Sequence, residues 1–158
     1  MMRAAFPGSF DPPTFGHIDI IERSRSIFDE LVVVIAENKQ KQYLFSAEER
    51  CAMMSEMVKE WKNVTVMLCD TLIVDLLKQQ NIRVMVRGVR NVTDFSYESE
   101  LSMMNKTLSP GIETIFMMTR PEFLVLRASS VRELAAFNGD LSALVPPIVA
   151  DALRKKYH

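Results

Sequence analysis

A continuous apolar run from Leu31 to Ala36 most constrains the fold of this chain. The run reads Leu-Val-Val-Val-Ile-Ala, and four of its six side chains are β-branched. A strand with one solvated face alternates apolar and polar residues, whereas a strand covered on both faces is apolar throughout. Strands of the second kind are typical of parallel sheets that carry helices on both sides. The run therefore predicts an α/β fold.

Four further apolar runs extend this pattern to five strands. They lie at residues 4–6, 64–68, 83–87 and 113–118, and segments with helical spacing or capping signals separate them. Strands that alternate with helices are typical of a doubly wound parallel sheet. No internal repeat or linker interrupts the chain, so we predict one domain over residues 1–158 with a five-stranded parallel sheet.

Capping signals and apolar spacing indicate where the helices lie. Ser46 with Glu49 three residues later forms a capping box, and Pro146-Pro147 opens a last helix that runs to Lys155. Four other helices are expected. The first starts at Gly16 with Ile18, Ile21 and Phe28 on one stripe, and another follows a cap at Thr71 with Leu72, Leu76 and Leu77 as its apolar face. The remaining two span 93–108, with Phe95, Leu101, Met104 and Leu108, and 129–137, with Gly139 closing the helix.

Charge and composition exclude several classes of partner. The net charge is −1, so nothing favours extended binding to nucleic acid or to anionic lipid. No apolar run reaches about 18 residues and no signal peptide is evident, which predicts a cytoplasmic protein without a membrane segment. Cys51 and Cys69 lack CxxC spacing and are interpreted as free thiols. Because the net charge is close to zero, we expect an anionic ligand to be bound by a few cationic side chains at defined positions.

The segment from Gly8 to His17 combines the features of a phosphate-binding turn. It reads Gly-Ser-Phe-Asp-Pro-Pro-Thr-Phe-Gly-His and joins the first strand to the first helix. Glycine permits close approach of a backbone, and a helix start offers free N–H groups and a positive dipole end. We expect Ser9 to supply a hydroxyl and an N–H group there, and His17 to add a hydrogen bond to the bound anion.

Polar residues gather where the predicted strands end, which is where doubly wound sheets bind ligands. The segments concerned are 9–17, Lys41, Asp70-Thr71, 87–90 and 120–130. Arg87 and Arg90 flank Gly88 at the end of a buried strand, and two guanidinium groups so placed can grip phosphate oxygens. Lys39 and Lys41 both lie in the polar loop 37–45 that follows the second strand, so Lys39 is an alternative to Lys41 as the functional lysine. No Ser-His-Asp set, carboxylate dyad or metal-ligand cluster is evident.

These segments resemble one enzyme family. GSFDPPTFGH resembles the T/HxGH motif of the nucleotidyltransferase superfamily, and RGVRNVTDFSYE resembles the RGLR-x₃-DF-x-YE segment of the bacterial phosphopantetheine adenylyltransferase family. The resemblance implies a Rossmann-like fold and adenylyl transfer from ATP to 4′-phosphopantetheine, with Mg²⁺ arriving with the nucleotide. It also implies a homo-oligomer, a hexamer in the family.

The resemblance implies roles for residues along the whole chain. His17, Lys41 and Arg90 would be the catalytic residues. The phosphopantetheine site would include Ser9, Lys41, Leu72, Ile73, Arg87 and Asn105. The ATP site would include Ser9, Phe10, His17, Gly88, Val89, Arg90, Glu98, Phe123, Leu124, Val125, Leu126, Arg127, Ala128 and Ser129. Asp94, Phe95 and Tyr97 are interpreted as fixing the loop and the helix start.

The chain departs from the family pattern at two positions. Arg127 and Ala128 stand where the family has serines, and the remaining hydroxyl at the helix start is that of Ser129 or Ser130. Two small donors are thus exchanged for one cation and one methyl group. We expect the phosphate to be held there by Arg127 and by backbone N–H groups.

Two alternatives remain open from the sequence. The acceptor can differ, as in a nicotinate mononucleotide adenylyltransferase or a cytidylyltransferase, and only the Arg87 segment and the apolar groove argue against this. The chain can also be a nucleotide-binding regulator that has lost catalysis, although the presence of His17, Lys41 and Arg90 speaks against it.

Overall fold

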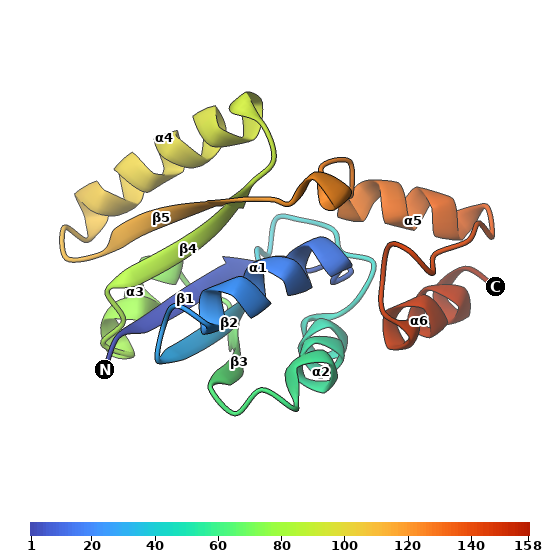
Figure 1. Cartoon of the computed structure of the whole chain (residues 1–158), viewed down its shortest axis with the longest axis horizontal. Helices are drawn as coiled ribbons and strands as arrows, with labels where there is room; N and C mark the ends of the chain where they lie inside the picture. The colour runs from blue at the N-terminus through green and yellow to red at the C-terminus, as the bar shows by residue number, and fades with distance from the viewer.

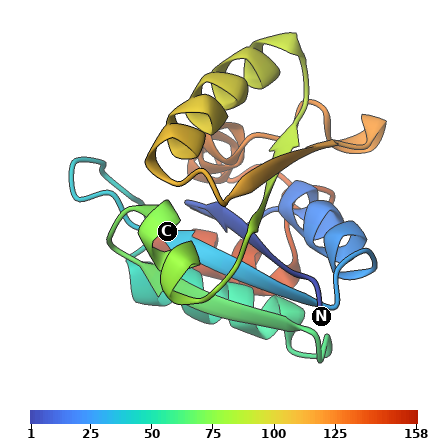
Figure 2. The ribbon, with the colours of Figure 1, turned by 90° about the vertical axis from the view of Figure 1, so that its left-hand side faces the viewer.

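The structure, a computed structural model, describes residues 1–158 and contains one sheet with helices on both faces (Figures 1 and 2). The elements follow the order β1 (Arg3–Gly8), α1 (Phe15–Arg25), β2 (Glu30–Ala36), α2 (Ala47–Val58), β3 (Val64–Cys69), α3 (Ile73–Gln79), β4 (Val84–Val89), α4 (Val92–Leu108), β5 (Glu113–Met118), the 3₁₀ turn η1 (Pro121–Phe123), α5 (Ala128–Ala136) and α6 (Pro147–Tyr157).

The five strands are parallel and lie in the order β3-β2-β1-β4-β5. The prediction of a doubly wound α/β sheet is therefore confirmed. The chain reverses its winding direction between β1 and β4, which is the switch point where such sheets bind ligands. No helix is both long and apolar enough to cross a membrane.

Two apolar layers cover the two faces of the sheet. One layer joins Ile21 of α1 and Met54 of α2 to Val33, while the other joins Leu77 of α3 to Val34. Neighbouring side chains of β2 thus enter opposite layers, which explains why this strand is apolar throughout. Each such side chain contributes about 1.5–3 kcal/mol through burial. A third cluster joins α2 to α5 and α6 beyond the carboxyl ends of the strands (Figure 1).

The capping box at Ser46 is confirmed, since Ser46 Oγ accepts from the N–H of Glu49 and the Glu49 carboxylate accepts from the N–H of Ser46. The predicted cap at Thr71 is wrong. α3 begins only at Ile73, and Leu72 occupies the cap position without a side-chain hydrogen bond and is 58% exposed. The Thr71 hydroxyl lies instead 3.6 Å from Cys69 Sγ.

Two further expectations about the helices differ from the structure. Phe28 is buried but lies beyond the end of α1, so it packs from a turn and not from the helical stripe. The left-handed residue that ends α5 is Asn138 (φ 56°) and not Gly139. A side chain at Gly139 would collide with Leu134, so the glycine provides packing space.

α4, the helix predicted to carry Phe95, Leu101, Met104 and Leu108, buries none of its residues. Phe95, Met104 and Leu108 are exposed, and Phe95 packs edge-on against Phe116 of β5. The helix therefore covers one edge of the sheet while its apolar side chains stay largely accessible to solvent.

Candidate active site

A cleft opens at the switch point because β1 and β4 separate toward their carboxyl ends. β1 pairs with β2 along its whole length, but it pairs with β4 only through Ala4 and Ala5. Beyond that point the carbonyl of Pro7 accepts a hydrogen bond from Arg87 Nη1 at 2.6 Å. A side chain thus bridges the two strands where the backbone ladder has stopped.

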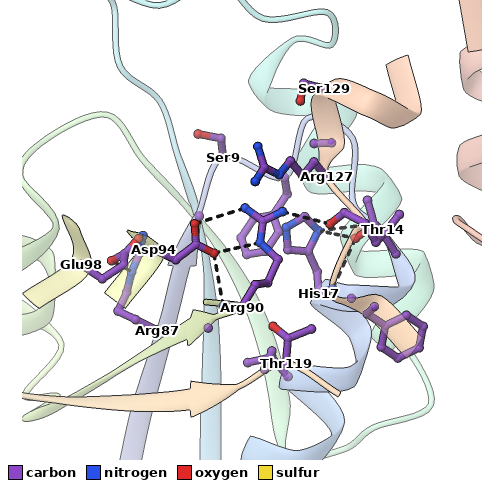
Figure 3. Close-up of a pocket in the computed structure, with 18 of the residues that line it drawn as sticks. Ser9, Thr14, His17, Arg87, Arg90, Asp94, Glu98, Thr119, Arg127 and Ser129 are labelled. Carbon is purple, nitrogen blue, oxygen red and sulfur yellow. Dashed lines mark hydrogen bonds and ion pairs between the residues drawn. The ribbon is translucent and has the colours of Figure 1, made fainter. Parts of the chain in front are cut away.

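The cleft holds a cavity of about 800 Å³, which lies within the range of small-molecule sites. The first helix, the end of β4, the start of α4 and the start of α5 supply its walls (Figure 3). Of the predicted residues it is lined by Ser9, Phe10, His17, Arg87, Gly88, Arg90, Glu98, Phe123, Leu126, Arg127, Ala128 and Ser129. We call it the first cavity.

His17 stands in the first turn of α1 with a defined tautomer. Its Nδ1 accepts a hydrogen bond from the N–H of Thr14 at 3.0 Å, and Thr14 Oγ1 accepts from the N–H of His17. The two residues form a capping box at the helix start. Because Nδ1 is an acceptor, the proton of the neutral ring resides on Nε2, which becomes a free donor.

The surroundings keep His17 neutral. Burial, followed by the charges of Arg90 and Arg87, lowers the pKa of His17 to about 4. The ring also packs edge-on against Phe10, with centroids 4.9 Å apart. Phe10 in turn lies against Gly8, where a Cβ would stand 2.9 Å from the ring. Gly8 therefore makes room for the aromatic support of the histidine, a role that the sequence did not indicate.

Arg90 is held by the start of α4. Its Nε donates to Asp94 Oδ2 at 2.9 Å, and its backbone N–H donates to the same carboxylate. Burial acts to raise the pKa of Asp94, but the hydrogen bonds and charge of Arg90 hold it below its usual value. Asn91 caps the helix by accepting from the N–H of Asp94 at 2.9 Å. Asp94 thus fixes the loop and helix start, as interpreted from the sequence.

Arg127 differs from the other guanidinium groups of the first cavity. Arg87, Arg90 and Arg132 each donate to a carboxylate or a backbone carbonyl, whereas the Arg127 side chain makes no hydrogen bond or ion pair in this structure. It occupies the cap position of α5 without capping the helix. An unpaired cation at a helix start favours binding of an anion.

The expected serine cap of α5 is absent. Ser129 lies inside the first turn of the helix and lines the first cavity, while Ser130 does not line it. Arg127 stands at the cap position instead, so the N–H groups of this turn have no side-chain acceptor and remain available to a ligand. Of the two candidate hydroxyls, only that of Ser129 faces the site.

A second cavity of about 660 Å³ lies beside the first. Pro7, Arg87 and Glu98 line both cavities, so the two meet at these residues. The second cavity also contains the predicted acceptor residues Leu72, Ile73 and Asn105, which lie on α3 and α4. Arg87 donates to both oxygens of the Glu98 carboxylate at 2.8 Å, across the boundary between the cavities.

The structure does not bring four predicted residues into either cavity: Lys41, Val89, Leu124 and Val125. Lys41 ends a turn, in which its N–H donates to the carbonyl of Asn38, and its side chain is exposed. Lys39, the competing residue, lines the second cavity. Val89 is buried in β4, and its carbonyl pairs with the N–H of Thr119.

The structure adds cavity residues that the sequence analysis did not select as binding residues: Asp11, Thr14, Asp94, Tyr97, Thr119 and Arg132. Arg132 donates to the carbonyl of Asp11 at 2.5 Å and so ties α5 to the turn that joins β1 to α1. Its only signal in the sequence was a basic side chain within the predicted helix 129–137. Thr119 follows β5 directly, and strand-end placement was its only signal.

Comparisons with known proteins agree with this geometry. The profile of the cytidylyltransferase-like family matches residues 5–134. A phosphopantetheine adenylyltransferase from Aquifex aeolicus is 46% identical over 156 residues, which cover 99% of this chain and 96% of that protein. A phosphopantetheine adenylyltransferase from Symbiobacterium thermophilum is 47% identical over 157 residues, covering 99% and 97%.

Solved structures share the fold at much lower identity. A protein from Vibrio parahaemolyticus assigned as a nicotinate-nucleotide adenylyltransferase has a TM-score of 0.74 at 19% identity, covering 99% of this chain and 96% of that one. A nicotinic acid mononucleotide adenylyltransferase from Plasmodium falciparum, complexed with NaAD, has a TM-score of 0.70 at 18% identity, covering 97% and 94%. These likenesses concern the fold alone. The family profile and the full-length relatives show that the chain belongs to the nucleotidyltransferases of the cytidylyltransferase-like family and, within them, to the phosphopantetheine adenylyltransferases.

Proposed function

We propose that this chain transfers the adenylyl group of ATP to 4′-phosphopantetheine, giving dephospho-coenzyme A and pyrophosphate. The observation that carries the proposal is the meeting of two cavities at Arg87 and Glu98. One cavity offers a helix start, a neutral histidine and guanidinium groups. The other is a groove with apolar and amide side chains. A polyphosphate suits the first, and an arm of methylenes and amides suits the second.

The proposed step needs no protein nucleophile. An oxygen of the acceptor phosphate attacks the α-phosphorus of ATP, the bond from that phosphorus to the bridging oxygen breaks, and pyrophosphate leaves with the electron pair. The attacking phosphate is already ionised, so no general base is required. What the protein must supply is positioning and stabilisation of negative charge.

The described side chains fit these two tasks. The Nε2–H of His17 is a neutral donor at the start of α1, and Arg90 and Arg127 bring positive charge to the same cavity. Arg87 stands at the junction, where the acceptor phosphate would arrive. Lys41, which the family resemblance makes catalytic, would have to move from its exposed position to take part.

We further propose that Mg²⁺ enters bound to the phosphates of ATP. The acidic side chains of the first cavity fit a protein-held ion poorly, because Arg87 engages Glu98, Arg90 engages Asp94, and the N–H groups of Leu44 and Phe45 engage Asp11. When bound, the ion would neutralise part of the phosphate charge. The guanidinium groups and His17 would still orient the nucleotide.

An acceptor comparison tests the proposed function. Purified protein is incubated with ATP, Mg²⁺ and either 4′-phosphopantetheine or nicotinate mononucleotide, while pyrophosphate release is followed and the product mass is measured. We expect turnover and the mass of dephospho-coenzyme A with phosphopantetheine only. Turnover with nicotinate mononucleotide alone would contradict the proposal, and ATP binding without turnover with either acceptor would support a regulator.

We also propose that the protein acts in the cytoplasm as a homo-oligomer, a hexamer by family resemblance. Apolar side chains of α4 and β5 support an interface between copies, since Val92, Phe95, Met103, Met104 and Met118 are all exposed. Light scattering on the eluting protein should give six times the chain mass of 18.1 kDa. A charged substitution, Met104→Glu, should lower that mass. A monomer for the unmodified protein would contradict the proposal.

A further inference from the structure

Arg50 of α2 is a buried cation that the proposed reaction does not use directly. Its side chain is 0% exposed, and it is the largest of the fully buried side chains. It lines neither cavity. In the sequence Glu-Glu-Arg it resembles any charged residue on a solvated helix face, so its burial is a finding of the structure.

Arg50 joins two segments of the site. Its Nη1 donates to the carbonyl of Ser9 at 2.7 Å, in the phosphate-binding turn. The same Nη1 donates to the carbonyl of Ala36 at 3.0 Å, and Nε donates to the carbonyl of Phe45 at 3.2 Å. Ala36 and Phe45 stand at the two ends of the loop that carries Lys41. One side chain therefore holds the turn and both ends of the loop.

The charge of Arg50 is poorly compensated. The nearest carboxylate oxygen, Glu37 Oε1, lies 3.9 Å from Nη2, and Nη2 makes no hydrogen bond. The guanidinium carbon lies 4.0 Å from the centroid of the Tyr43 ring. Burial of a cation without a hydrogen-bonded carboxylate is unfavourable. Such departures from the rules of stable packing are expected at functional sites.

The bond to Ser9 sets the orientation of one peptide group. In a trans peptide the C=O and the N–H point in opposite directions, so a Ser9 carbonyl turned toward Arg50 turns the N–H of Phe10 the other way. That N–H makes no hydrogen bond in the structure. Phe10 lines the first cavity and has a φ of 50°, a conformation that non-glycine residues adopt only when their surroundings impose it.

We propose that Arg50 is a positioning residue for the transfer, because it keeps the Ser9–Phe10 peptide turned so that the Phe10 N–H faces the bound phosphate and keeps the Lys41 loop seated on the same turn. This inference rests on the proposed adenylyl transfer. Asp11 acts beside Arg50, since its carboxylate accepts from the N–H groups of Leu44 and Phe45 at 2.8 and 3.0 Å. The protection of these two amides reports whether the loop is seated.

Two variants and one control test the role of Arg50. Arg50→Met keeps the side-chain volume and removes every donor. Arg50→Lys keeps the charge, but a single nitrogen cannot reproduce the spacing of Nε and Nη1. Ile82→Ala is the control, because Ile82 is buried just before β4, at the end of the sheet opposite the site, and its loss should lower Tm without touching the turn.

We measure folding by circular dichroism, kcat and the KM of each substrate, and hydrogen exchange at the Leu44 and Phe45 amides without ligand. Misplacing a reacting group by a small distance costs up to about a hundredfold in rate, so we expect kcat to fall more than about fivefold in both Arg50 variants. Both KM values should stay within about threefold, because every side chain that lines the two cavities is unchanged in the variants. Exchange at the two amides should accelerate more in the Arg50 variants than in Ile82→Ala.

The result that overturns the proposal is a folded Arg50→Lys with kcat within about fivefold of the unmodified enzyme, or a loss of kcat that Ile82→Ala reproduces at the same Tm. If Arg50→Met fails to fold, the kcat of Arg50→Lys alone tests the proposal against the same limit of about fivefold. If the unmodified protein shows no turnover with phosphopantetheine, the proposed function is wrong. Amide exchange then still decides whether Arg50 seats the loop.

Discussion

Arg87 donates two parallel hydrogen bonds to Glu98, with Nε and Nη2 each 2.8 Å from a carboxylate oxygen (Figure 3). This ion pair stands where the two cavities meet, and the third nitrogen of Arg87 reaches the carbonyl of Pro7. The guanidinium is thus fixed before any ligand arrives. Its orientation is therefore set in advance, which reduces the entropy lost when a phosphate binds.

Replacement of Arg87 should weaken binding of the phosphorylated acceptor. A hydrogen bond to a charged group contributes about 1.5–3 kcal/mol, so Arg87→Ala should raise the KM for phosphopantetheine about 10- to 100-fold. The KM for ATP should change by less than about threefold, since Arg90 and Arg127 remain in the first cavity. Initial-rate measurements with each substrate varied separately check this.

The double variant Arg87→Ala/Glu98→Ala provides the control. Without Arg87, the Glu98 carboxylate remains half-buried and repels the incoming phosphate. Removal of both groups should therefore lower the acceptor KM below that of Arg87→Ala alone. A rise in the KM for ATP alone in the single variant would place Arg87 with the nucleotide.

His17 should act on turnover more than on binding. Loss of one donor to a developing charge costs about two to three orders of magnitude, and we expect His17→Ala to lose about a thousandfold in kcat while most ATP affinity remains. His17→Gln is the matched variant, because glutamine at the third helical position can keep the capping box with Thr14. Stopped assays of pyrophosphate release measure the loss. Near-normal turnover in a folded His17→Gln would remove the histidine from the mechanism.

The lowered pKa of His17 predicts how stability depends on pH. The folded pKa is about 4, against an ordinary value of 6.5, so between these values the unfolded chain binds a proton that the native protein does not. Stability of the ligand-free protein should therefore fall as the pH is lowered from about 6.5 to about 4, by up to about 3 kcal/mol from this group. Above that window the contribution is zero.

Urea unfolding at a series of pH values measures this effect, with His17→Gln as the comparison. Asp94 also has a lowered pKa, but its unfolded value lies below the histidine window, so its loss of stability appears at more acidic pH. The stability of the unmodified protein relative to that of His17→Gln should fall across the window as the pH is lowered. A difference that is independent of pH would show that the folded protein does not lower the pKa of His17.

The sequence and the ligand-free structure favour different lysines of the loop as the functional one. The resemblance makes Lys41 catalytic, while the ligand-free structure places Lys39 along the second cavity and leaves Lys41 exposed. We expect Lys41→Ala to lower kcat by about a hundredfold or more, and Lys39→Ala to change it by less than about fivefold. Single-turnover rates under saturating substrates check both. The reverse order would assign the catalytic role to Lys39.

The sequence predicted the fold where local signals and burial agree. The run through Val32, Val33 and Val34 predicts a strand covered on both faces, and its side chains do enter two apolar layers. The capping box of Ser46 and Glu49 is a local arrangement, so a stretch of four residues defines it. Thr71 fails as a cap because the helix starts two residues later, and cap propensity does not set the length of the preceding turn.

The site itself depends on features that are not local. The cleft exists because β1 and β4 separate after Ala5, and no residue pattern encodes the register of two strands far apart in sequence. Arg50 and Arg132 reach the turn between β1 and α1 from other helices, so their partners Ser9 and Asp11 become known only once the chain is folded. Most of the remaining cavity residues could be predicted because they directly follow strands, and the topology brings the carboxyl ends of all strands together.

A crystal structure with a non-hydrolysable ATP analogue and 4′-phosphopantetheine tests most directly whether two phosphorylated substrates meet at this cleft. We predict the α-phosphate within hydrogen-bond distance of His17 Nε2, the acceptor phosphate at Arg87, and about 3–3.5 Å between the attacking oxygen and the α-phosphorus. Ligand phosphates that contact neither His17 nor Arg87, or that lie in separate regions of the protein, would contradict the account.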